Sequence, residues 1–313
     1  MAVPWRIVFM GTPRIAAATL DQLIDGPDPV VGVVTQPDRP AGRGQQSSPS
    51  PVRKVAEAHD ISVIAAEKIR TPDFLERLKQ WQPEIIVVVA YGRILPKTVL
   101  DLPPQGCLNV HYSLLPKYRG AAPAAWTIIN GEREGGVTTM KLVEKMDAGA
   151  IYLQEAIKLA GDETTATLQS KLTSIGAGLL LETLRRLKEG TLTALAQDES
   201  AATLAPLLKK EDGLIDWHRS ASETERRVRG FDPWPGSFTH AGGKLLKVHR
   251  ARIIASPRTG DPGEVIRADG GGFWIATASG ILELVEVQWE NKRRLPGTEF
   301  VKGARIKVGD RLE

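Results

Sequence analysis

The sequence predicts an α/β protein with a doubly wound, mostly parallel sheet, followed by a smaller β-barrel. Strand-like apolar runs alternate with helical segments over the first 110 residues, as in a parallel sheet covered by helices on both faces. Beyond residue 230, short β-runs are separated by Gly-Gly and Ser-Gly turns, which are typical of hairpins in a small barrel. The length of 313 residues suits two domains.

The individual elements follow from local patterns. Continuous apolar runs predict strands buried on both faces, and alternating runs predict strands with two unlike faces. We expect strands at residues 5–10, 29–35, 84–90, 107–111, 137–143 and 150–157. A capping Ser or Thr before Pro or before helical apolar spacing predicts the start of a helix. We expect one helix capped by Thr12 with Pro13 at its first position, and others over residues 71–81, 163–189 and 220–231.

Two segments lack such patterns. Residues 36–51 are rich in Pro, Gly and Ser and nearly free of apolar groups, which predicts an exposed, mobile loop carrying Arg39 and Arg43. A long loop in a compact domain is often functional. Residues 191–208 have little periodicity and are interpreted as a linker.

The composition excludes several classes of protein. Apolar residues make up 42% and charged residues 25%, as in globular proteins with a sizeable core. No run approaches 18 consecutive apolar residues, so we expect no membrane span, and the amino end lacks a signal-peptide layout. The single cysteine, Cys107, excludes an internal disulfide and a multi-cysteine zinc site. We therefore expect a cytoplasmic protein.

The net charge of +4 is unevenly distributed. Residues 1–206 carry 22 Lys and Arg against 22 Asp and Glu, whereas residues 207–313 carry 19 against 15. An anionic partner of the second part is one interpretation. An ordinary, slightly basic surface is the other, and charge alone does not decide between them.

The stretch NVHYSLLPKYRGAAP, residues 109–123, is the most unusual part of the chain. If residues 107–111 form a strand, Cys107, Asn109 and His111 share one face. The amide and the imidazole then lie near the carboxyl end of a parallel strand, where ligands bind to such sheets. Both groups can donate hydrogen bonds, so together they suit an oxyanion formed when a nucleophile attacks a carbonyl.

A carboxylate follows at Asp147, in a turn between two expected strands. Such a carboxylate can orient an imidazole and favour its charged form. An Asp in a turn also fits ordinary turn chemistry. Asn109 and His111 likewise fit a hydrogen-bonded pair inside a core, so these alternatives stay open on the residues alone.

Other chemistries fit the sequence less well. Cys107 and His111 would be about 13 Å apart on a strand, too far for a nucleophile and its base. A metal site needs clustered ligands, and the remaining histidines are scattered. They are His59, His218, His240 and His249. The turn MGTP at residues 10–13 lacks a dinucleotide-binding or P-loop pattern.

The order Asn, His, Ser-Leu-Leu-Pro and Tyr-Arg-Gly within residues 109–120 resembles the motif of the folate-dependent formyltransferases. Asp147 stands where that family has its third catalytic residue, and GRILP at residues 92–96 resembles the family's folate-pocket segment. Resemblance to the members that act on methionyl initiator tRNA extends over nearly the whole chain. It is carried by VFMGTP (8–13), TQPDRPAGRG (35–44), KKEDGLIDW (209–217) and RGFDPWPGSF (229–238).

The resemblance implies a reaction. The formyl group of 10-formyltetrahydrofolate is transferred to the α-amino group of methionyl initiator tRNA, as required for translation initiation, and no metal takes part. Asn109 and His111 are implied as oxyanion donors, and Asp147 as the group that orients His111 and relays a proton. Tyr118 and Arg119 either support the loop or contact substrate.

The resemblance also implies domains and binding residues. A catalytic domain spans 1–190, a linker 191–208 and an OB-like tRNA-binding domain 209–313, in a chain expected to be monomeric. The residues implied to frame the folate are Arg93, Ile94, Leu95, Ser113, Leu114, Leu115 and Pro116. Those implied to bind tRNA are Arg43, Lys209, Lys210, Lys244, Lys247 and Arg250, and the basic residues Arg226, Arg227, Arg229 and Arg252 fit the same surface.

Three alternative functions remain. Another formyltransferase of this family would act on an amino-nucleotide or an amino-sugar, but with no such basic second domain. A folate hydrolase would use the same triad and release formate to water. A tRNA-binding protein with a relic catalytic domain is the third, although Asn109, His111 and Asp147 are all present.

Overall fold

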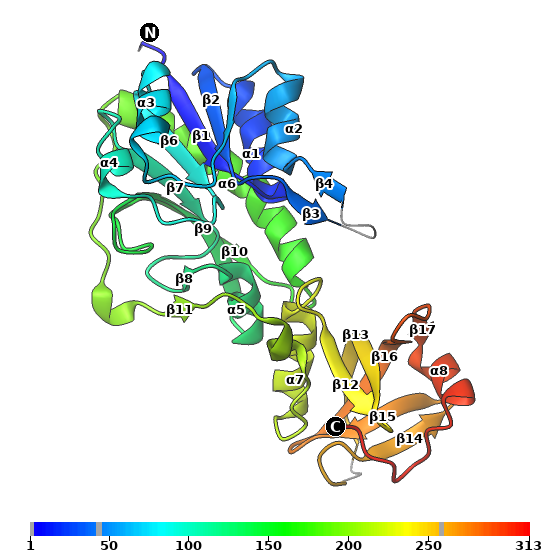
Figure 1. Ribbon diagram of the computed structural model, residues 1–313. Coiled ribbons are helices and arrows are strands. Elements are labelled where there is room, and N and C mark those ends of the chain that lie inside the picture. Colours follow the sequence, from blue (N-terminus) through cyan, green and yellow to red (C-terminus); the bar gives the residue numbers. More distant parts are fainter. Residues whose placement is uncertain (1–2, 42–45, 257–259) are drawn as a thin grey trace. The chain divides into compact units, whose positions relative to one another are not determined.

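The computed structural model describes residues 3–41, 46–256 and 260–313 of the chain (Figure 1). The chain divides into two compact units, each built from several segments. The first unit consists of Met1–Pro123, Gly135–Ile157 and Gln169–Pro206. The second consists of Ala124–Glu134, Lys158–Leu168 and Leu207–Glu313. Within the described part of the chain, no helix has the length and apolar character needed to cross a membrane.

The first unit is built on a seven-stranded sheet with the order β10-β9-β7-β6-β1-β2-β5. The strands are β1 Ile7–Gly11, β2 Val30–Thr35, β5 Val63–Ala65, β6 Ile85–Val89, β7 Cys107–His111, β9 Glu134–Lys141 and β10 Ile151–Lys158. β1 runs parallel to β2 and β6, β2 to β5, and β6 to β7, whereas β9 runs antiparallel to β7. The predicted doubly wound, mostly parallel sheet is confirmed, and the carboxyl ends of β1, β6 and β7 share one edge.

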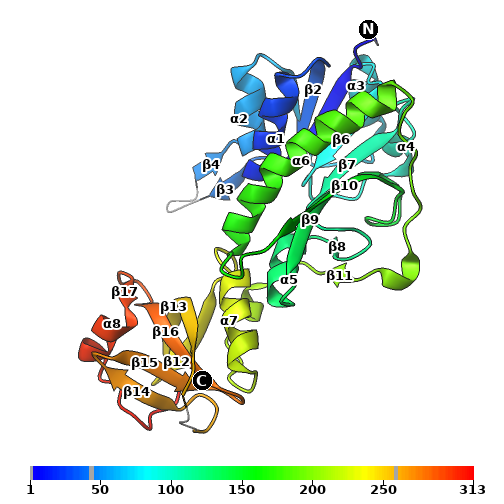
Figure 2. The same cartoon turned by 180° about the vertical axis from the view of Figure 1, so that it is seen from behind.

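Helices cover both faces of this sheet. On one face, Phe74 and Leu78 pack against Met10 and Val88 of the strands. These two residues belong to α3 (Pro72–Gln80), which shares that face with α4 (Lys97–Leu100). The other face carries α1 (Arg14–Ile24), α2 (Pro51–Ala58) and the long helix α6 (Thr165–Lys188), which crosses in front of the strands in Figure 2.

The first predicted helix cap is wrong, and the second is confirmed. Pro13, not Thr12, is the N-cap of α1, and no side chain caps that helix. Thr12 Oγ1 instead accepts a hydrogen bond from the Gln36 backbone (3.4 Å) and donates one to the Tyr91 carbonyl (3.4 Å), so it links neighbouring loops. Thr71 caps α3 as predicted, by accepting a hydrogen bond from the Phe74 backbone (3.4 Å).

The loop predicted over residues 36–51 contains regular structure. β3 (Arg39–Ala41) pairs antiparallel with β4 (Gln46–Ser48). The two strands pair through backbone hydrogen bonds, which do not require alternating apolar side chains. The Pro- and Gly-rich sequence therefore contained no pattern from which these strands could be predicted. Arg43, one of the predicted tRNA-binding residues, lies outside the described residues.

The second unit carries an antiparallel sheet with the order β12-β13-β16-β15-β14, to which β17 pairs at β16. Its elements are α7 Ala221–Gly230, β12 Ser237–Ala241, β13 Lys244–Ile254, β14 Val265–Asp269, β15 Gly272–Ala276, β16 Ile281–Trp289, β17 Leu295–Pro296 and α8 Gly297–Ala304. Gly242 and Gly243 both have positive φ (55° and 73°) in the β12–β13 turn, where the Gly-Gly pair predicted a hairpin. The smaller β domain that the sequence predicted is thereby confirmed.

Candidate active site

Strand β7 presents the predicted polar pair on one face. Val110 points to α6, because a Cβ on Gly176 of that helix would lie 3.1 Å from Val110 Cγ1. Asn109 and His111 therefore point to the opposite face, as alternation along a strand requires. They are 8% and 6% exposed. Among the residues that the structure describes, none forms a hydrogen bond with the Asn109 side-chain amide.

One ring nitrogen of His111 is hydrogen bonded, and the other faces a carboxylate at a longer distance. Nε2 lies 2.9 Å from the carbonyl oxygen of Tyr118. A carbonyl can only accept a hydrogen bond, so Nε2 carries a hydrogen. Nδ1 lies 3.8 Å from Oδ2 of Asp147, and both side chains are largely buried. The fold thus brings His111 and Asp147 close together, at a separation longer than a hydrogen bond.

Asp147 occupies a strained turn between β9 and β10. Its φ is +50°, a left-handed conformation that residues other than glycine adopt rarely. Its Oδ2 accepts a hydrogen bond from the backbone N–H of Gly120 (2.7 Å). The same carboxylate oxygen therefore faces both His111 and the loop that follows β7.

That loop, residues 113–122 and hereafter the motif loop, is fixed from beneath by β9 and β10. Ser113 Oγ donates to the carbonyl of Lys117 (2.7 Å). Thr138 Oγ1 of β9 donates to the carbonyl of Ser113 (2.6 Å) and accepts from the backbone N–H of Leu115 (3.1 Å). Gln154 Nε2 of β10 donates to the Leu115 carbonyl (2.9 Å). These bonds make the motif loop a rigid frame.

The other side of the motif loop is held by residues 197–205, hereafter the strap. β11 (Leu204–Ala205) pairs in parallel with β8 (Arg119–Gly120). A Cβ on Gly120 would lie 2.6 Å from the Ala205 carbonyl oxygen, so this approach requires glycine. Thr203 Oγ1 accepts from the Tyr118 backbone (2.9 Å). The strap lies within residues 191–208, which were interpreted as a linker. Its role in holding the motif loop was therefore not predicted.

Arg119 anchors the strap. Its side chain is 5% exposed, and its guanidinium donates to Gln197 Oε1 (2.8 Å) and to both carboxylate oxygens of Glu199 (3.0 and 3.1 Å). Hydrogen bonds from Arg119 and Lys145 lower the pKa of Glu199 to about 2, so this carboxylate is charged at neutral pH. Of the two roles considered for Arg119, support of the loop is the one that these contacts provide.

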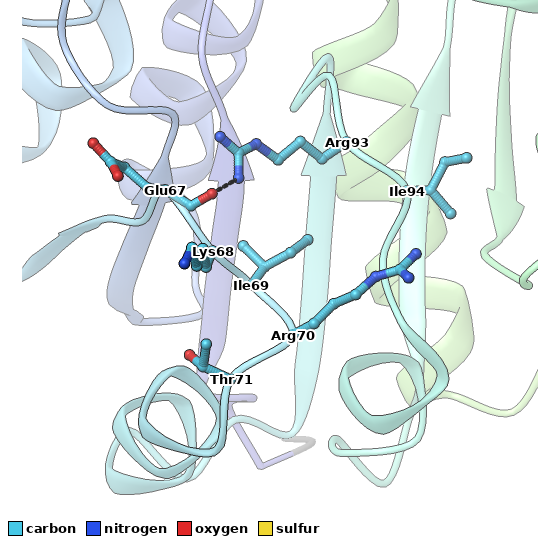
Figure 3. A pocket seen from close by; sticks show the side chains of 7 residues that line it. All are labelled: Glu67, Lys68, Ile69, Arg70, Thr71, Arg93 and Ile94. Atoms are coloured by element: carbon cyan, nitrogen blue, oxygen red, sulfur yellow. Dashed lines mark hydrogen bonds between the residues drawn. The ribbon is translucent and has the colours of Figure 1, made fainter.

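A separate pocket opens at the segment predicted to frame folate (Figure 3). Its volume is about 330 Å³, and it is lined by Glu67, Lys68, Ile69, Arg70, Thr71, Arg93 and Ile94. Arg93 donates to the backbone carbonyl of Glu67, and the side chain of Arg70 extends toward Ile94. The predicted residues Arg93 and Ile94 thus line a cavity, while Leu95 is buried beside them. Lys68 and Arg70 were not predicted to line a pocket, because no sequence pattern distinguishes them from ordinary surface cations.

The buried thiol of Cys107 has no catalytic character. It contacts the carbonyls of Val99 and Leu100 at 3.8 Å. Burial raises the pKa of this thiol to about 12, so it is protonated at neutral pH.

The predicted tRNA-binding lysines lie on the surface of the second unit. Lys209 and Lys210 are exposed at the start of a 3₁₀ turn, Lys210–Gly213. Lys244, Lys247 and Arg250 are exposed along β13. A register shift between Val248 and Arg250 moves Arg250 to the outer face that Lys247 occupies.

The arginines of α7 are engaged inside the second unit instead. Arg229 pairs with Glu225 (2.6 Å) and donates to the Glu163 carbonyl (2.8 Å). Arg226 Nε donates to the Ile129 carbonyl (3.1 Å), and Arg227 lies 4.9 Å from the Phe231 ring centroid. Fewer of the second unit's cations are therefore available to a ligand than its number of Lys and Arg residues suggests.

Comparisons with known proteins agree with this geometry. The family described as formyl transferase matches residues 5–184, and the family described as formyl transferase, C-terminal domain, matches residues 207–305. A methionyl-tRNA formyltransferase of Desulfotalea psychrophila is 50% identical over 301 residues, which are 96% of this chain and 93% of that protein. Another, of Geobacter sulfurreducens, is 46% identical over 307 residues, which are 98% of this chain and 96% of that protein.

A solved structure shares the fold at lower identity. HypX from Aquifex aeolicus, in complex with tetrahydrofolic acid, matches with a TM-score of 0.62 and 21% identity over 99% of this chain. The match covers 51% of HypX, so this chain spans about half its length, and the likeness shows the fold alone. The two family matches together cover most of the sequence. The chain therefore belongs to the formyl transferase family.

Proposed function

We propose that this protein transfers the formyl group of 10-formyltetrahydrofolate to the α-amino group of methionyl initiator tRNA. The observation that carries the proposal is the position of His111 between the Tyr118 carbonyl and the Asp147 carboxylate, beside Asn109 on the same strand face. The identity of 46–50% with methionyl-tRNA formyltransferases over nearly the whole chain supports the same acceptor. Translation takes place in the cytoplasm, so the proposal includes a cytoplasmic location.

The reaction needs little help in its first step. The α-amine of an amino acid has a pKa of about 8, and esterification to tRNA lowers it further, so much of it is neutral near pH 7. Its nitrogen attacks the formyl carbon, and the carbonyl π-electrons move to oxygen as a tetrahedral oxyanion. The bond between the formyl carbon and folate N10 then breaks, and the proton lost by the amine ends on N10.

The triad is assigned to the difficult part of this reaction. Asn109 donates from its amide and His111 from Nδ1 of its imidazolium, since Nε2 is bonded to the Tyr118 carbonyl, and both stabilise the oxyanion. Asp147 orients His111 and relays the proton from the amine toward N10. The roles of His111 and Asp147 need fixed side chains, and the hydrogen bond from Gly120 to Asp147 supports that rigidity.

The pocket fits a folate donor by its charge. A folate carries a carboxylate-bearing glutamate at the end remote from N10. Lys68, Arg70 and Arg93 place three cations against one carboxylate, Glu67, around one cavity, next to the apolar Ile69 and Ile94. We assign the glutamate end to these cations and the ring system to the frame made by Leu95 and the motif-loop residues Ser113, Leu114, Leu115 and Pro116.

The second unit is assigned to the tRNA. Antiparallel β domains of this size commonly bind nucleic acid through a basic surface. Lys244, Lys247 and Arg250 follow one another along β13, and Lys209 and Lys210 lie in the same unit. Lys247 and Arg250 share the outer face of β13, and two exposed cations on one face suit neighbouring phosphates.

The test is a formylation assay on the purified protein with 10-formyltetrahydrofolate and methionyl initiator tRNA, beside methionyl elongator tRNA. We expect N-formylmethionyl-tRNA from the initiator and little from the elongator. An Asp147→Asn variant is the control for the site. Formate release without formylated tRNA would instead identify a folate hydrolase. Formylation of an amino-sugar or amino-nucleotide but of no tRNA would identify another member of the family.

A further inference from the structure

We propose that Gln197 is a positioning residue for the reaction, acting by holding Asp147 against His111. The inference rests on the proposed function, because it deepens the role given there to Asp147. Gln197 lies in the strap, 50 residues from Asp147 along the chain.

The donor end of Gln197 closes the Asp147 turn. Its Nε2 donates to the backbone carbonyls of Asp147 (2.8 Å) and Gly149 (2.7 Å). These two bonds use both hydrogens of the amide. They clamp the backbone on either side of Ala148, next to a residue whose φ of +50° needs support from its surroundings.

The acceptor end of Gln197 is fixed independently. Its Oε1 accepts from Arg119 Nε (3.1 Å) and Nη2 (2.8 Å). A guanidinium can only donate and a backbone carbonyl can only accept, so the amide has one orientation that satisfies both sides. Arg119 is held in turn by Glu199. Gln197 is therefore locked at both ends.

Gln197 and Arg119 together connect the two backbone segments next to His111, which are the motif loop and the Asp147 turn. Arg119 stands between Tyr118, whose carbonyl meets His111 Nε2, and Gly120, whose N–H meets Asp147 Oδ2. Gln197 links Arg119 directly to the Asp147 turn. A shift of that turn would move Oδ2 away from Nδ1, which already lies at 3.8 Å. A displacement of about 1 Å at a catalytic group can cost about 100-fold in rate.

Two variants of Gln197 separate this role from general support of Arg119. Gln197→Ala removes both ends of the link. Gln197→Glu keeps the length and the acceptor for Arg119 but replaces the two donors that hold Asp147 and Gly149. We expect both variants to lower kcat by about 10- to 100-fold, with KM for the folate and for tRNA unchanged within about twofold. A role limited to supporting Arg119 would leave the kcat of Gln197→Glu close to that of the wild type.

A double-mutant cycle tests whether Gln197 acts through Asp147. If it does, Gln197→Ala will lower kcat by less than about twofold in a chain that already carries Asp147→Asn. An independent role would give the same loss in both backgrounds and would overturn the proposal. Ser200→Ala is the matched control, since Ser200 lies in the strap and, among the described residues, its side chain bonds to Asp198 and not to the Asp147 turn. Thermal unfolding of each variant identifies any loss that comes from misfolding.

The two proposals can fail separately. Release of tetrahydrofolate reports the chemistry whichever acceptor takes the formyl group, so the cycle can be measured even if the acceptor is not tRNA. In that case the proposed function fails and the role of Gln197 is still decided. If the wild type formylates methionyl-tRNA and Gln197→Glu matches it in kcat, the proposed function stands and the positioning role is refuted.

Discussion

His111 and Asn109 are held in different ways, and this difference bears on how each can act. Both nitrogens of His111 face protein oxygens, one from Tyr118 and one from Asp147. The Asn109 amide is placed by the strand alone. The hydrogen bond to Tyr118 restricts rotation of the imidazole, whereas the amide can adjust its torsion. Under the proposed mechanism, His111 would therefore orient the oxyanion and the Asn109 amide would adjust to it.

Alanine at either position is expected to lower kcat by about 10²- to 10³-fold, the typical loss for one oxyanion donor. The fold should survive, because β7 keeps its backbone pairing with β6 and β9. Asn109→Asp is the sharper variant, since it keeps the size and turns a donor into a charged acceptor that repels the oxyanion. Steady-state kinetics and circular dichroism measure both effects. Near-normal turnover in a variant would remove that residue from the mechanism.

At the scale of elements, β13 shows how one irregularity can bring two positive charges to the same face of a strand. Leu246 and Val248 point into the core and Lys247 points outward, whereas Lys244 is exposed at the start of the strand. Strict alternation would turn Arg250 inward with Leu246 and Val248. The register shift against β16 before Arg250 keeps its charge on the outside. The bulge thus lengthens the proposed tRNA surface along the strand.

Lys244→Ala and Lys247→Ala should each reduce the slope of log K for tRNA against log salt by about 1, if each lysine meets a phosphate. Stability should hardly change, because both side chains are exposed. Lys79→Ala is the matched control: it removes one exposed charge from α3, where Lys79 pairs with Glu76. Binding titrations at several salt concentrations measure the slope. An equal fall in the control would mean that the effect is only one of net charge.

The elements also show how far the sequence was informative. The strand at residues 107–111 and its two faces were predictable, because every second side chain there has the same character. The strap was not predictable. It is held by Thr203, Gln197 and backbone groups, which contact a loop some 80 residues away, and such contacts produce no periodic pattern in the local sequence. The cations Lys68 and Arg70 were missed for a similar reason, because only the fold brings them beside Arg93.

At the scale of the whole molecule, the two units are interleaved in the sequence. Residues 124–134 and 158–168 belong to the second unit although they precede the predicted linker. They are bound to α7 there: Thr165 Oγ1 donates to the Gly230 carbonyl (2.6 Å). A Cβ on Gly230 would lie 2.5 Å from Ile129 Cγ1, so glycine allows this close packing. The predicted division into a catalytic domain (1–190), a linker (191–208) and a tRNA-binding domain (209–313) assigns a function to each part, and it stays a prediction.

A chain that ends at Pro206 is expected to keep the seven-stranded sheet and to bind folate, with a much shallower salt slope for tRNA and a higher KM for methionyl-tRNA. Its melting temperature should fall, because Ile129 and Thr165 lose their partners on α7, and exposing a side chain such as isoleucine costs about 1.5–3 kcal/mol. Circular dichroism beside the salt titration separates the two effects. A folded truncated chain with an unchanged slope would exclude the second unit from tRNA binding.

The pairing of β8 with β11 has a further consequence for biosynthesis. Tyr118 is bonded to Thr203, which is 85 positions later in the chain. A ribosome that adds about 5–20 residues per second needs about 4–17 s to cover that interval. Until then the loop beside His111 lacks its pairing with the strap. Most of the polypeptide must therefore be synthesised before its catalytic centre can become rigid.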